Sequence, residues 1–128
     1  MSFEDLRTDN PLIDTEHKNL HRMLSSLQAV IAAGRDMDVI LEAFMVMKER
    51  MRLHCEAEED YARRIDPRAC ETLRAEHKRL MAEIDELRTH LTEPSVDRQA
   101  AVEHFLTSLE RHDQQIDVPI FKRLNGTA

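Results

Sequence analysis

The side chains with the clearest capacity for chemistry in this chain are histidines and carboxylates that stand on otherwise apolar stripes. Four histidines interrupt four separate stripes, and two of them are followed on the same stripe by a carboxylate. This set comprises His17, His54, Glu58, His77, His112 and Asp117. Buried charged or imidazole groups need partners. Imidazole binds first-row transition metals and carboxylates can bridge two ions, so the set predicts a buried metal centre.

Four amphipathic helices would have to position these side chains. The chain has only 2 Gly and 4 Pro, and 34% of its residues are charged, which favours helix. Apolar residues recur at spacings of three and four, which predicts helices over about 14–34, 37–65, 67–91 and 96–124. Asp14 and Asp36 are the expected N-caps, and Pro67 suits the first turn of the third helix. The short connections predict one domain over residues 1–128, an all-α, antiparallel up-down-up-down four-helix bundle.

The four histidines are expected to lie at one level of this bundle. In each consecutive pair, the two histidines lie almost equally far from the turn between them, with the turns taken near residues 35, 66 and 94. A mismatch of about one residue corresponds to about 1.5 Å along a helix. The apolar stripes do not require this agreement, so it favours a metal centre. A mononuclear site, a zinc site and a metal-free hydrogen-bonded network are the alternatives.

The spacing of His112 and Asp117 predicts an irregular helix. Five residues turn about 140° beyond a full turn in a regular α-helix, which would not aim both side chains inward. A π-bulge would correct the direction, and Pro119 lacks the N–H that the helical ladder needs. We therefore expect an irregularity between His112 and Pro119.

Charge and composition exclude some function classes. The formal net charge of −7 argues against nucleic acid and against anionic membranes. No apolar run approaches the roughly 20 residues of a membrane span, and the first ten residues lack the basic and apolar regions of a signal peptide. The 2 cysteines are too few for a disulfide framework and fit a reducing compartment. A cytoplasmic location is therefore expected.

Four sequence elements together resemble those of hemerythrins and bacteriohemerythrins. The segment 13–20, IDTEHKNL, resembles the first-helix signature of that family, and HCEAEE at 54–59 resembles its HxxxEE segment. Glu76-His77 and the HxxxxD of 112–117 follow in the order of the family. The resemblance covers about residues 10–124.

The resemblance implies two iron ions joined by an oxo or hydroxo bridge, with Glu58 and Asp117 also bridging them and the histidines as the other ligands. It implies that the protein binds O2 as a carrier, store or sensor. An enzyme acting on peroxide or NO, and a zinc-binding or metal-free interaction module, are the alternatives. No general acid or base stands out beyond the ligand set, and Glu59 is expected on the solvent side or behind the ligands.

One departure from the family pattern leaves the expected centre a histidine short. The family's third helix usually carries HxxxH, but Leu73 stands four residues before His77. Tyr61 is the preferred substitute ligand, because a phenolate can bind Fe(III), while His21 and Cys70 are further candidates for ligands or pocket residues. The absence of this histidine ligand predicts a centre that is less suited to reversible O2 carriage. It would be more suited to peroxide or NO chemistry, or to sensing.

Overall fold

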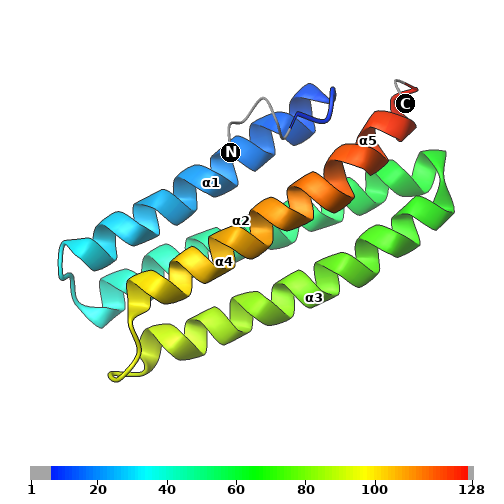
Figure 1. Ribbon diagram of the computed structural model, residues 1–128. Coiled ribbons are helices and arrows are strands. Elements are labelled where there is room, and N and C mark those ends of the chain that lie inside the picture. Colours follow the sequence, from blue (N-terminus) through cyan, green and yellow to red (C-terminus); the bar gives the residue numbers. More distant parts are fainter. Residues whose placement is uncertain (1–6, 127–128) are drawn as a thin grey trace.

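The computed structural model describes residues 7–126, and in this range the chain forms four antiparallel rods. The elements are α1 (Pro11–Ala32), α2 (Met37–Ile65), α3 (Pro67–Thr92), α4 (Arg98–His112), a π-helical segment η1 (Asp113–Asp117) and α5 (Val118–Leu124). Figure 1 shows that α4 and α5 continue as one rod and that the turns between successive rods lie at alternating ends of the bundle. The prediction of an all-α four-helix bundle is therefore confirmed. The first six residues, which include part of the segment that lacks signal-peptide features, lie outside the described residues.

The first helix begins earlier than the expected start near Asp14. Asn10 is the N-cap, and its side chain accepts hydrogen bonds from the backbone N–H groups of Leu12 and Ile13 at 3.1 and 3.3 Å. Pro11 follows at the first helical position, where a missing N–H costs nothing. Asp14 instead lies inside the first turn and accepts from the backbone N–H and the hydroxyl of Thr8, both at 2.8 Å.

The other helix ends follow the sequence signals more closely. The second helix covers the expected range, although the side chain of Asp36 makes no capping hydrogen bond. Asp66 caps α3 through the N–H of Arg68, with Pro67 in the first turn as predicted. The last rod begins at Arg98 rather than near 96, because Asp97 accepts from the N–H of Ala100 and so fixes the first turn.

The apolar core is divided into two clusters. The larger one contains Leu24, Phe44 and Leu87 and lies toward the α1–α2 and α3–α4 turns. The smaller one contains Leu73 and Phe121 and lies toward the α2–α3 turn. Each rod passes from one cluster to the other, and the buried histidines and carboxylates lie between them. Within residues 7–126, no helix is long and apolar enough to cross a membrane.

Candidate metal centre

A buried polar layer crosses the bundle between the two apolar clusters, and it contains all six side chains predicted to form a metal centre. His17 comes from α1, and His54 and Glu58 come from α2, one helical turn apart. His77 comes from α3, and the continuous last rod supplies the remaining two, His112 and Asp117. Each of the six is at most 4% exposed. The expectation that the four histidines share one level therefore agrees with their positions.

The last rod is irregular at the place that the sequence predicts. Residues Asp113–Asp117 form a π-helical turn, in which the N–H of Val118 donates to the carbonyl of Asp113. This wider turn brings His112 and Asp117 to the same face, and His112 Nε2 lies 3.1 Å from Asp117 Oδ1. The prediction of an irregularity between His112 and Pro119 is confirmed.

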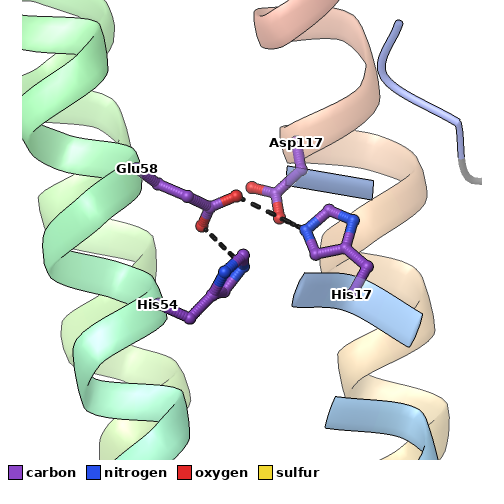
Figure 2. Close-up of side chains that lie close together, drawn as sticks. All are labelled: His17, His54, Glu58 and Asp117. Atoms are coloured by element: carbon purple, nitrogen blue, oxygen red, sulfur yellow. Dashed lines mark hydrogen bonds and ion pairs between the residues drawn. The ribbon is translucent and has the colours of Figure 1, made fainter. Parts of the chain in front are cut away.

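Four of the six side chains form one compact group, which is drawn in Figure 2. His17 Nε2 lies 3.0 Å from Asp117 Oδ2 and 3.4 Å from Glu58 Oε2. His54 Nε2 lies 3.2 Å from Glu58 Oε1, and its ring meets the ring of His17 edge to face at a centroid distance of 4.9 Å. The donor atoms of these four residues all lie within 4.8 Å of one another, so they could hold one ion.

A second group uses the same two carboxylates with the other two histidines. His77 Nε2 lies 3.0 Å from Glu58 Oε1, and the ring centroids of His77 and His112 are 5.4 Å apart. The donor atoms of Glu58, His77, His112 and Asp117 also lie within 4.8 Å of one another. Two metal-capable groups therefore meet at Glu58 and Asp117.

The charges of this layer depend strongly on one another. Burial lowers the pKa of His17, but Asp117 and Glu58 raise it, and the net result lies well above the ordinary value. Burial likewise lowers the pKa of His112, yet Asp117 raises it and prevails. For Glu58, burial raises the pKa, while His54 and His17 lower it to well below its usual range. The pKa of Asp117 is lowered as well, because His112 and His17 outweigh burial and the repulsion from Glu58.

Several buried donor and acceptor atoms at the middle of the layer make no hydrogen bond. They are Glu58 Oε1 and Oε2, Asp117 Oδ1 and His77 Nε2. The nitrogen atoms nearest to Glu58 Oε1 and Asp117 Oδ1 lie at 3.0 and 3.1 Å, in His77 and His112, but the angles do not allow a hydrogen bond. A buried polar atom without a partner is costly. Lone pairs that converge without hydrogen bonds are what a metal ion requires of its ligands, so the residues present fit a metal.

His77 differs from the other histidines in what lies behind it. Its Nδ1 atom lies 2.8 Å from Glu59 Oε2, which places Glu59 behind the ligand set. Burial lowers the pKa of His77, but its neighbours Cys55 and Glu58 raise it to about 12. Burial also raises the pKa of the Cys55 thiol, although His77 acts against this, so Cys55 remains a thiol.

A third buried carboxylate beside the centre was missed by the sequence reasoning. Asp113 is 1% exposed, its Oδ2 atom lies 3.2 Å from His21 Nε2, and its Oδ1 atom lies 3.8 Å from His17 Nε2. The sequence pattern singles out no acid or base beyond the ligand set, and Asp113 is a carboxylate in a position to be one. Regular α-helical geometry turns Asp113 away from His112, and only the π-helical turn directs both inward. The predicted irregularity was the signal that would have found it.

None of the residues expected as substitutes for the missing histidine, Tyr61, His21 and Cys70, belongs to either metal-capable group. Leu73 is fully buried in the smaller apolar cluster, together with Cys70, which is a free thiol outside both metal-capable groups. The hydroxyl of Tyr61 donates to Asn125 Oδ1 at 2.7 Å, and its ring packs against Phe121. His21 Nε2 lies 3.2 Å from Asp113 Oδ2, and His21 belongs to neither metal-capable group.

The fold and this layer together define a helical-bundle protein with a buried metal-capable centre of histidine and carboxylate side chains. The family model described as the hemerythrin HHE cation binding domain matches residues 8–124. The chain therefore belongs to this family, as its motifs predict. No curated protein and no solved structure gives a significant match to the chain.

Proposed function

We propose that this protein is a non-haem di-iron protein that binds O2 in its bundle core and serves as a carrier, store or sensor. The observation that carries the proposal is the sharing of Glu58 and Asp117 by two metal-capable groups. A carboxylate has two oxygen atoms, so each of the two can serve two ions. His17 and His54 would then complete the ligands of one ion. The proposed location is the cytoplasm, where its two free cysteines would stay reduced.

The charge of the layer supports bound cations. With neutral histidines, the buried carboxylates of Glu58 and Asp117 carry two negative charges, and none of the buried residues in the described range is a lysine or arginine. Buried charges without compensation are strongly unfavourable. Metal ions would offset them and use the lone pairs that now make no hydrogen bonds.

The donor set and the family favour iron. Both groups combine imidazole with carboxylate and contain no thiolate, which is typical of non-haem iron sites. Bound iron would supply reversible electron transfer toward O2, another small diatomic molecule or peroxide. Zinc accepts the same donors, so a zinc-binding or metal-free module is the outcome that the experiment must distinguish.

Four protein donors for each ion leave room for an outside ligand. Leu73, which stands where a further histidine would be expected, lies in an apolar cluster with Ile13, Ile120 and Phe121. Apolar side chains at this end of the centre exclude water and favour small uncharged molecules. O2 and NO fit this description.

Turnover of peroxide or NO at the same centre is the second candidate function, and Asp113 favours it. A buried carboxylate 3.8 Å from His17 Nε2, hydrogen bonded to the partly exposed His21, is placed to hold a proton beside the centre. Carriage of O2 does not need a separate proton carrier, whereas cleavage of peroxide or reduction of NO does.

Metal analysis combined with absorption spectra tests the first proposal. We expect about two iron ions per chain after aerobic purification, near-ultraviolet bands of a bridged ferric pair, and their reversible loss and return on anaerobic reduction and O2 readdition. Zinc in place of iron, or no metal, would overturn the proposal. About one iron per chain would limit it to a mononuclear centre.

Asp113→Asn tests the second candidate function, because it preserves the size of the side chain and its contact with His21. We expect unchanged metal content and a fall of roughly tenfold or more in peroxide or NO turnover, as for the loss of a general acid or base. Glu110→Gln, about one turn earlier on α4, is the matched control. Equal turnover in both variants would remove the proton-carrier role.

A further inference from the structure

One histidine of the centre is held from behind by a carboxylate, and the other three are not. His77 Nδ1 lies 2.8 Å from Glu59 Oε2. The Nδ1 atoms of His17, His54 and His112 are buried and make no hydrogen bond. The two metal-capable groups therefore differ: only the group of His77 and His112 contains a histidine whose Nδ1 atom, on the side away from the centre, has a carboxylate partner.

This contact fixes the tautomer of His77 when it acts as a metal ligand. A ligand imidazole is neutral and carries one N–H. A carboxylate can only accept, so this N–H lies on Nδ1 and donates to Glu59, and Nε2 offers its lone pair to the metal. That Nε2 atom lies 3.0 Å from Glu58 Oε1, at the middle of the centre. A carboxylate behind a ligand histidine fixes its tautomer and its orientation and makes the imidazole a stronger donor.

Glu59 is itself held from the protein surface. Its side chain is 23% exposed, and its Oε1 atom lies 3.7 Å from Arg74 Nε. Glu59 and Arg74 both line two cavities on the α2–α3 face, of about 430 and 330 Å³. His77 also lines the larger cavity. Arg74, Glu59 and His77 thus form a continuous chain of polar contacts from solvent to the centre.

We propose that Glu59 is a positioning residue that strengthens the His77 half of the metal centre, the half in which Leu73 stands in place of a histidine. This inference rests on the proposed metal centre. The missing histidine removes a donor from the helix that carries His77, and the anionic partner increases the electron donation of the histidine that remains. The centre is then asymmetric, because a carboxylate accepts from the Nδ1 atom of a histidine in one half, whereas neither histidine of the other half has such a bond.

Glu59→Gln and Glu59→Leu test the role, since the first removes the charge but can still accept a hydrogen bond and the second removes both. The protein is loaded with Co²⁺ or Zn²⁺, which need no redox chemistry, and metal release to a chelator is followed. We expect one of two equivalents to leave roughly tenfold or more faster in Glu59→Gln, with a larger effect in Glu59→Leu, while the second equivalent leaves at the rate of the unaltered protein.

Glu56→Gln is the matched control, because Glu56 is an exposed glutamate of the same helix that bonds Arg52 instead of a histidine. A purely structural role of Glu59 would lower the thermal stability of the metal-free protein and speed the release of both equivalents together. That result, or release curves that match the control, would overturn the inference while leaving the proposed function intact. If the unaltered protein binds no metal, the proposed function fails first and this inference fails with it.

Discussion

His112 Nε2 lies 3.1 Å from Asp117 Oδ1, although these residues are five positions apart on one rod. In a regular α-helix their side chains would diverge by about 140°. The π-helical turn Asp113–Asp117 removes this divergence and also directs Asp113 inward. The geometry of the centre therefore depends on one irregular turn that local helix propensity alone would not select.

Asp117→Asn should remove most of the bound metal, because Asp117 belongs to both metal-capable groups. The substitution keeps the size of the side chain and removes its charge. We expect one metal ion per chain or fewer, measured by elemental analysis after dialysis. In the metal-free protein, we also expect the pKa values of His17 and His112 to fall, because Asp117 helps to raise both of them. Titration by NMR measures that change.

Asp113→Asn serves as the control for this prediction, since Asp113 is equally buried but lies outside both groups. Retention of two metal ions in Asp117→Asn, or equal losses in the two variants, would contradict the shared role of Asp117.

Much of this centre could be predicted from the sequence because a bundle with short turns converts residue numbers into levels. His17, His54 and His77 lie on regular helices, where the rise and the turn per residue are fixed. Even the irregular turn could be predicted, since the spacing of His112 and Asp117 fits only a wider turn.

Side-chain partners beyond the first ring of donors could not be predicted in the same way. Tyr61 continues the inward stripe of its helix, yet its hydroxyl donates a hydrogen bond to Asn125, just after α5. Helical periodicity does not reveal this contact. Glu59 and Asp113 lie next to ligand candidates in the sequence. The partner of Glu59 depends on the side-chain rotamers of α2 and α3, and that of Asp113 depends on the π-helical turn. The helix α1 begins before the predicted N-cap Asp14, because Asn10 caps it and Pro11 suits its first position.

Asn10→Ala should destabilise the protein by about 1 kcal/mol, the usual cost of losing an N-cap that accepts hydrogen bonds from the helix. Asn10 bonds two backbone N–H groups of the first turn. Asp36→Ala is the matched control, because Asp36 occupies the N-cap position of α2 without a side-chain capping bond. Urea unfolding of the metal-free variants measures both changes. An equal or larger loss in Asp36→Ala would show that the capping hydrogen bonds do not account for the effect.

Leu73→His should restore a donor to the His77 half of the centre. Leu73 is fully buried, so in the metal-free protein a histidine there should cost about 1–3 kcal/mol for an unsatisfied polar group. With metal bound, we expect one equivalent to be released roughly tenfold more slowly and the O2 adduct to last longer. Leu80→His, on the other side of His77 in the larger apolar cluster, is the control. It should lower the stability of the metal-free protein without slowing metal release. No gain in metal retention would mean that position 73 does not face the centre.

The stability of the metal-free protein should pass through a maximum in mildly acidic solution. The pKa values of His17, His77 and His112 are raised in the folded state, the second to about 12. Their contribution is therefore complete below the unfolded value of 6.5 and is lost as the pH rises toward the folded values. The pKa values of Glu58 and Asp117 are lowered, so their contribution is present above their unfolded values of 4.5 and 3.8 and is lost in acid.

Metal binding should reverse the alkaline side of this profile, because ligand histidines must be deprotonated and metal affinity rises as the pH increases. We expect the Tm of the metal-free protein to fall between about pH 6 and pH 9, while that of the loaded protein stays constant or rises. The difference between the two Tm values should therefore widen with pH. Calorimetry of both forms measures it, with Asp117→Asn as the comparison in which the fall is smaller. A metal-free Tm that rises over this range would show that the histidines of the layer are neutral in the folded protein.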